Sequence, residues 1–440
     1  MHAATIASHR FGYSEPALLP LRSDPQGWVQ AQWAAPRPFD AAGLPTGPQA
    51  YALGLDVLQK TLRATDAQGD KALEPARRQL RQTNLDGLQR RWQHIVATDT
   101  PVAERWVQFW ANHFCVAATR ATVAALVWPH EHEAVRPHAF GRFVDLLRAA
   151  TLHPAMLLYL DNAQSVGPAS RAGQRRDRGL NENLARELLE LHTLGVRGGY
   201  TQADVTQTAR LLTGWTVRND GTGTAFVPFL HEPGRKQVLG RSYPEGPEAI
   251  DLLLRDLAMH PSCAAHLATK LVRHFVTDEP PAALVEAVAA RFRATDGDLR
   301  ATAQALFGHP LTWSPDNPPK YKRPEELVIS AHRAGRLPVL AVEPLAGAVQ
   351  AMGQPPARAP SPQGWPDRTD DWLSPDAVYK RVQWAERFAA TLGRQLDART
   401  LAREGFGEDL GDNTRQQIER AASGVQALAL WLVSPEFQRR

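Results

Sequence analysis

The sequence predicts a mainly α protein, a large single unit of many helices with a few short strands or hairpins in its loops. Apolar residues recur at helical spacing through most of the chain, Pro and Gly separate these stretches, and alternating strand-like segments are scarce. No self-similar stretch repeats at a period of about 20–50 residues, which argues against a repeat array. We therefore expect residues 1–440 to form one continuous helical domain.

The expected helices are those stretches in which apolar side chains recur every three or four positions. Several of them begin with Pro, which suits the first helical position because its missing N–H is not needed there. They are residues 73–96, 101–116, 141–160, 247–259, 261–276, 281–293, 298–307, 323–334, 378–392 and 414–433. The strand-like stretches 224–230 and 237–239 are expected to pair as a short hairpin.

Three Gly- or Pro-rich stretches, 163–180, 218–243 and 354–372, are expected to be loops. The last has five Pro in nineteen residues and cannot be a regular helix. Its Trp365 and Trp372 are large apolar side chains that normally need a surface to pack against. We therefore expect 354–372 to be a packed loop inside the unit and not a free linker.

The composition excludes several classes of protein. In 440 residues, 43% are hydrophobic and 22% charged, which excludes a disordered, collagenous or membrane-embedded chain. Arg and Lys (50) nearly balance Asp and Glu (46) and are interleaved with them, so no nucleic-acid binding is expected. No apolar run is long enough for a membrane span. Cys115 and Cys263 are too few for a disulfide framework or a Cys-rich zinc site.

Residues 180–215 are the most informative stretch. Asn181 and Gly195 are expected to cap the two ends of one helix, and Thr201 with Asp204 forms a capping box that begins a second. At 100° per residue, Arg186, Glu187 and Glu190 lie on the polar face of the first helix. His192 falls on the opposite, apolar face, where we expect it to hydrogen-bond within the core and not to bind metal.

Glu187 and Glu190 are the strongest candidates for chemistry in this stretch. Two carboxylates held close together can raise the pKa of one of them for acid–base work, or can bind a cation. The alternative is an ion network with Arg186, which needs no ligand. A site needs a further group from another segment, and His113 is the best candidate, although its stripe with Trp106 and Trp110 is also typical of a core histidine.

Other signals are weaker. His231 and Lys236 lie in a loop, where functional side chains are common but surface charges are too. The string HEHEA at 130–134 lacks the HExxH spacing of zinc proteases, and no dinucleotide-binding, Walker A or GxSxG motif occurs.

The string NENLARELLELHTLGVRGGYTQADVTQTARLLTGW resembles the bacterial family called domain of unknown function 1800. The similarity extends to WVQFWANHF, the HEPGRK loop, KRPEELVISAHRAG, SPQGWPD and the final SPEFQRR, and so covers nearly the whole chain. The family carries no assigned activity, so the resemblance gives its motif positions no role. These positions are His113, Asn181, Glu182, Asn183, Arg186, Glu187, Glu190, His192, Thr213, Gly214, Trp215, His231 and Lys236.

The resemblance also suggests a partner and a location. Proteins of this family are often exported and often encoded beside a second family, domain of unknown function 1501, which resembles sulfatases and alkaline phosphatases. The chain itself begins without the pattern of a signal peptide. It is therefore expected to be a soluble cytoplasmic protein, or alternatively a periplasmic one that is exported together with a partner.

Three functional hypotheses follow. The first is a metal- or acid–base-dependent enzyme, with Glu187, Glu190 and His113 as ligands of a divalent metal or as proton-transfer groups, Arg186 beside them, and His231 and Lys236 closing a loop over the pocket. The second is a non-catalytic binding or assembly partner of the sulfatase-like protein. The third treats the motif helices as a packed core whose polar residues are all in ion pairs.

Overall fold

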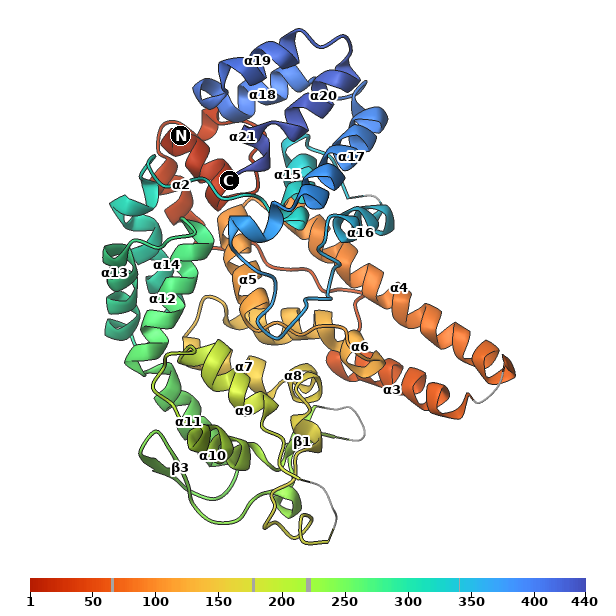
Figure 1. The fold of residues 1–440 in the computed structure, drawn as a ribbon, viewed down its shortest axis with the longest axis vertical. Helices are drawn as coiled ribbons and strands as arrows, with labels where there is room; N and C mark the ends of the chain where they lie inside the picture. Colours follow the sequence, from red (N-terminus) through yellow and green to blue (C-terminus); the bar gives the residue numbers. More distant parts are fainter. Residues whose placement is uncertain (65–66, 176–178, 219–222, 340) are drawn as a thin grey trace.

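The computed structural model describes residues 1–64, 67–175, 179–218, 223–339 and 341–440 (Figure 1). The prediction of a mainly α fold is confirmed, because helices make up most of the described chain and its described strands form only two two-stranded sheets. None of the described helices combines the length and apolar character that crossing a bilayer requires.

The helices and strands have the following bounds. The α-helices of the first half are α1 (Ala3–Thr5), α2 (Pro25–Ala31), α3 (Gly47–Arg63), α4 (Ala67–Ala97), α5 (Pro101–His113), α6 (Ala121–Pro129), α7 (Phe143–Leu152), α8 (Pro154–Tyr159), α9 (Asn183–Glu187) and α10 (Gln202–Leu212). Those of the second half are α11 (Glu248–Ala258), α12 (Pro261–Phe275), α13 (Ala282–Ala294), α14 (Leu299–Gly308), α15 (Pro324–Ala334), α16 (Val342–Ala351), α17 (Pro375–Leu392), α18 (Ala398–Phe406), α19 (Asp412–Glu419), α20 (Gly424–Val433) and α21 (Pro435–Gln438). The strands are β1 (Trp215–Val217), β2 (Thr224–Phe226), β3 (Lys236–Val238) and β4 (Arg241–Tyr243). The π-helical turns include η3 (His130–Val135) and η6 (Leu188–Thr193).

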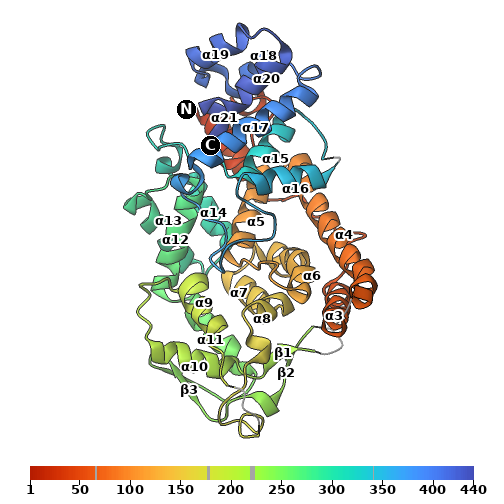
Figure 2. The ribbon, with the colours of Figure 1, turned by 45° about the vertical axis from the view of Figure 1, so that its right-hand side comes forward.

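Helix α5 lies at the centre of the molecule, between the C-terminal helices and the α7–α11 region (Figures 1 and 2). Pro101 occupies its first turn, and nearly all of its side chains are buried. Trp106 and Trp110 pack edge to face at 5.7 Å between ring centroids, which favours a fixed position for the helix. The last residue of α5 is His113, so this helix delivers a buried imidazole to the region where η6 and α12 meet.

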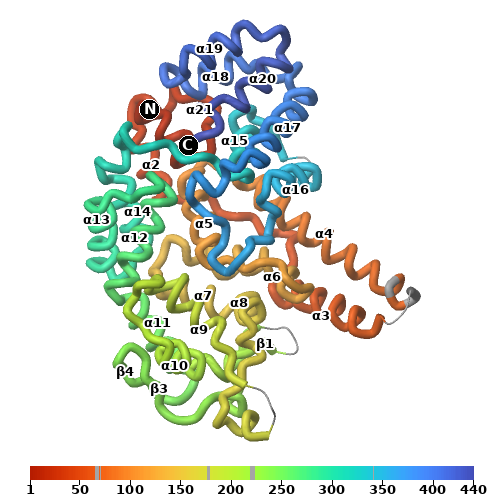
Figure 3. Tube along the Cα trace, viewed as in Figure 1, coloured from red at the N-terminus to blue at the C-terminus, as the bar shows by residue number. Residues whose placement is uncertain are grey.

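Helices α3 and α4 form an arm that projects from the rest of the molecule (Figures 1 and 3). The segment between α16 and α17 runs back across α5 (Figure 3). Trp372 in this segment is buried, and its ring lies 6.1 Å from that of Trp365. The segment therefore packs on the central helix.

Two expected helices are broken, and the expected hairpin is wrong. The helix expected at 141–160 divides at Pro154, because His153 before it adopts an extended conformation with ψ 140. The helix expected at 414–433 divides into α19 and α20. The strand-like stretches pair with other partners, β2 with β1 and β3 with β4, because each finds a nearer strand along the chain.

Candidate active site

A cavity of about 440 Å³ lies where α5 ends against η6, α12 and residues 363–371. This volume is within the range of small-molecule sites. The side chains that matter for its chemistry are His113, Glu190, His266, Lys270, Arg273 and Asp367.

The π-helical turn η6 forms one wall of this cavity. It follows α9 directly, and the N–H of Leu194 closes it by donating to the Leu189 carbonyl at 2.8 Å, five residues back. Such wide turns are rare inside helices and occur frequently at functional sites. Asn181 makes the predicted cap contact, since its Oδ1 accepts from the N–H of Asn183 at 2.9 Å at the start of α9.

Two histidines from different helices bind consecutive carbonyls of η6. His113 Nε2 lies 3.1 Å from the His192 oxygen, and His266 Nε2 lies 3.0 Å from the Leu191 oxygen. Because a carbonyl oxygen only accepts, each Nε2 carries the proton and each Nδ1 keeps its lone pair. Nδ1 of His113 is buried and has no hydrogen-bond partner among the described residues. Both rings line the cavity as neutral imidazoles.

Burial and positive charge keep these imidazoles neutral. Burial lowers the pKa of His113 well below its usual range, and the charge of Lys270 lowers it further. The same two causes lower the pKa of His266 to about 4. Burial also lowers the pKa of Lys270 to about 8, with Asp367 acting in the opposite direction. Shifts of this size in one cavity are typical of functional sites.

The two predicted carboxylates take different positions. Glu190 lines the cavity and accepts a hydrogen bond from the Tyr200 hydroxyl at 3.2 Å. Glu187 is half-buried outside the cavity lining, and burial together with the charge of Glu190 raises its pKa. Arg186 bonds Glu182 and Gln202, at 3.3 and 2.9 Å. Of the predicted set, the structure therefore brings His113 and Glu190 together in one cavity.

His192 is buried as predicted, but the predicted hydrogen bond of its ring is wrong. Neither ring nitrogen has a partner among the described residues. Its ring packs near those of Phe114 and His113, at 5.1 and 6.0 Å between centroids. Burial lowers its pKa to about 3, so it fills the core as a neutral ring.

His231 and Lys236 contact each other and are not among the described residues that line the cavity. Lys236 Nζ donates to His231 Nε2 at 3.0 Å, and His231 Nδ1 donates to the Thr213 carbonyl at 2.7 Å. Both side chains are buried. This arrangement ties the loop before β3 to the end of α10.

Sequence reasoning missed the contribution of α12. His266, Lys270 and Arg273 occur at i, i+4 and i+7 of this helix, so they share one face. This polar stripe in an otherwise apolar helix was the available signal. No group of three His, Cys, Asp or Glu among the described residues is arranged to hold a metal ion.

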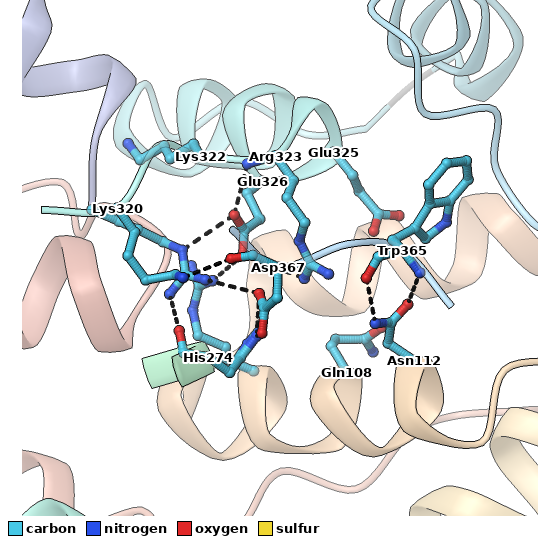
Figure 4. A network of polar contacts seen from close by, with 12 residues as sticks. Gln108, Asn112, His274, Lys320, Lys322, Arg323, Glu325, Glu326, Trp365 and Asp367 are labelled. Carbon is cyan, nitrogen blue, oxygen red and sulfur yellow. Dashed lines mark hydrogen bonds and ion pairs between the residues drawn. The ribbon is translucent and has the colours of Figure 1, made fainter. Parts of the chain in front are cut away.

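A second, smaller cavity of about 90 Å³ lies on the other side of Asn112 and Trp365 and contains side chains that are mostly paired. Arg91 bonds Glu131 at 2.9 Å and also bonds Glu325. Glu326 pairs with Arg105, Arg323 and Arg440. Figure 4 shows Glu326 and, beside it, Asp367, which Arg440 links to Glu326. Since these charges already have partners, they are better explained as structural than as catalytic.

Asn112 separates the two cavities and holds the 354–372 loop. Its Nδ2 donates to the Trp365 carbonyl at 3.0 Å, and its Oδ1 accepts from the Trp365 N–H at 2.8 Å (Figure 4). Gly364 next to it has φ +83, and a Cβ there would lie 2.4 Å from the Asn112 carbonyl. Glycine is therefore required at this contact.

The fold and cavity define a large helical protein with a histidine-lined pocket. Residues 8–439 match the model of a protein family described as "Protein of unknown function (DUF1800)". The chain belongs to this family. No curated protein and no solved structure matches the chain.

Proposed function

We propose that the protein is an enzyme that uses acid–base chemistry, with the 440 Å³ cavity as its active site. The observation that supports it best is that His113, a neutral imidazole whose buried Nδ1 has no partner among the described residues, lines a cavity of substrate size. A general base needs an unprotonated lone pair within reach of the substrate. His266 presents a second neutral imidazole, and Glu190 with Tyr200 presents a carboxylate that can exchange a proton.

A divalent metal on Glu187, Glu190 and His113 is the other form of this proposal. It is the less favoured form, since the cations Lys270 and Arg273 line the same cavity and repel a metal ion. Elemental analysis of the purified protein, beside Glu187→Gln and His113→Ala, tests it. Stoichiometric metal in the wild type that is lost in both variants would establish the metal form.

The acid–base form is tested by substrate consumption. The purified protein is incubated with a pooled metabolite extract, and the mixture is followed by mass spectrometry. We expect the wild type to consume a compound, and His113→Ala and Glu190→Gln to slow this at least about 100-fold. His138→Ala is the matched control, because its ring makes no hydrogen bond to the described residues. Unchanged turnover in His113→Ala would remove the proposal.

The alternative proposal is a non-catalytic binding or assembly partner of the sulfatase-like protein of the neighbouring family. This alternative depends on the Trp-bearing loop 354–372, in which Trp372 is buried and Trp365 is hydrogen-bonded to Asn112. The loop therefore presents little free aromatic surface for a partner. Co-purification of the two proteins at micromolar concentration would support this alternative, and failure to associate would remove it.

A further inference from the structure

We infer that the cavity binds an oxyanionic group of a small substrate, a carboxylate, phosphate or sulfate, between Lys270 and Arg273. The inference deepens the proposed function, since it names the substrate class of the same cavity. The starting observation is that Lys270, half-buried at the cavity wall, makes no hydrogen bond or ion pair with any described residue. Burying an ammonium without a partner is costly, so such a group is retained for a ligand more readily than for stability.

Lys270 differs in this respect from the other buried lysines. Lys236 donates to His231, Lys320 to Asp278 and Lys322 to Ser14. Each of these ammonium groups is satisfied inside the protein. Lys270 therefore differs from these three lysines, and it lines a cavity large enough for a small molecule.

Arg273 supplies the second donor group. It lies three residues after Lys270, on the same face of α12, and also lines the cavity. Its Nε donates to the Asp278 carbonyl at 3.3 Å, while its Nη groups make no hydrogen bond to the described residues. A guanidinium fork beside an ammonium is a common way to hold an oxyanion.

The carboxylates of the cavity are already occupied. Asp367 accepts from His274 Nδ1, with both of its oxygens at 2.9 Å (Figure 4). Burial alone would raise the pKa of Asp367, but His274, Lys320 and Arg323 hold it well below its usual range. Glu190 accepts a hydrogen bond from Tyr200, and Asp371 accepts one from the N–H of Arg368 at 3.2 Å. No described carboxylate lies within ion-pair distance of Lys270, so this cation is open to an external anion.

An anion here would also act on the histidines. The charged and titratable groups around Lys270 come from α12, from α5 and the residues after it, from η6 and from the 363–371 segment. They are His266, Arg273, His113, Cys115, His192, Glu190, Asp367, Arg368 and Asp371. Because the Lys270 charge lowers the pKa of all three imidazoles, a bound anion offsets it and makes them better bases. Substrate binding would thus prepare the bases that the proposed function needs.

Calorimetric titration with sulfate and with acetate tests this inference. Neither probe titrates near pH 7, and the ionic strength is kept constant with chloride. We expect saturable binding of at least one probe, and at least tenfold weaker binding in Lys270→Gln and in Arg273→Gln. Lys270→Arg should keep most of the affinity, and Lys71→Gln on the exposed face of α4 is the matched control. At pH 8, near the lowered pKa of Lys270, binding should take up protons, because an anion favours the charged form of this lysine; the uptake is measured as a dependence of the heat on the buffer.

Two results would overturn the inference: no saturable binding of either probe, or equal affinity in wild type and a folded Lys270→Gln. Circular dichroism and the unfolding temperature establish whether each variant is folded. If Lys270→Gln does not fold, the affinity of Arg273→Gln for the probes tests the inference in its place. The outcome is separable from that of the proposed function. Anion binding lost in Lys270→Gln, with turnover unchanged in His113→Ala, keeps the anion site and removes the acid–base role. Turnover that requires His113, without any anion binding, would keep the acid–base role and remove the anion site.

Discussion

At the scale of single residues, Lys270 should lower the stability of the protein. Burial lowers its pKa from 10.5 to about 8. Lys270→Met removes this cost, and we expect the Tm at pH 7 to rise by on the order of 2 °C. Below pH 8 the folded and unfolded states both hold the proton, so the full cost is present. Between pH 8 and 10.5 only the unfolded state holds it, so the wild type gains stability and the difference in Tm shrinks.

Thermal unfolding of wild type and Lys270→Met from pH 6 to pH 10.5 measures this effect. Lys71→Gln, an exposed lysine of α4, should change the Tm little at any pH. A Lys270→Met variant that is less stable than the wild type at pH 7 would mean that the aliphatic part of this side chain outweighs its charge.

At the scale of elements, local signals were readable from the sequence and long-range ones were not. The capping box at the start of α10 forms as predicted, with Asp204 Oδ2 accepting from Thr201 N at 2.8 Å, because its partners are three residues apart. The π-helical turn η6 was not predicted. Its carbonyls are bound by His113 and His266, which lie 79 and 75 residues away from them in the chain. A helical wheel contains no such information, and for the same reason the α12 face of the cavity was missed.

The loop at 354–372 gives a prediction at this scale. Asn112→Ala removes both hydrogen bonds to Trp365, so we expect the loop to open more often and its amides to exchange hydrogen about tenfold faster. Hydrogen-exchange mass spectrometry of peptides covering 361–372 measures this. Asn413→Ala, on the exposed side of α19, is the control. Unchanged exchange in the loop would show that Trp372 and its neighbours hold it without Asn112.

At the scale of the whole molecule, one buried ion network joins distant parts of the chain. Glu326 of α15 pairs with Arg105 of α5, with Arg323 beside it and with Arg440 after α21. Its carboxylate is 2% exposed, so its removal leaves buried guanidinium groups without their counter-charge. Changes of this kind cost about 3–5 kcal/mol. We expect Glu326→Gln to lower the Tm far more than Glu419→Gln, an exposed glutamate of α19.

The same network predicts how the protein responds to acid. Burial by itself would raise the pKa of Glu326, but Arg440, Arg105 and Arg323 hold it well below 4.5, and the pKa of Asp367 is also held well below its usual 3.8. A carboxyl with a lowered folded-state pKa contributes its full stability above its unfolded pKa and loses it as the pH falls. The Tm should therefore be nearly flat from pH 7 to about 5 and fall steeply below. In Glu326→Gln the acid-side fall should be shallower, because one of the two linked groups no longer takes up a proton. Parallel curves for the variant and the wild type would mean that other carboxylates govern acid unfolding.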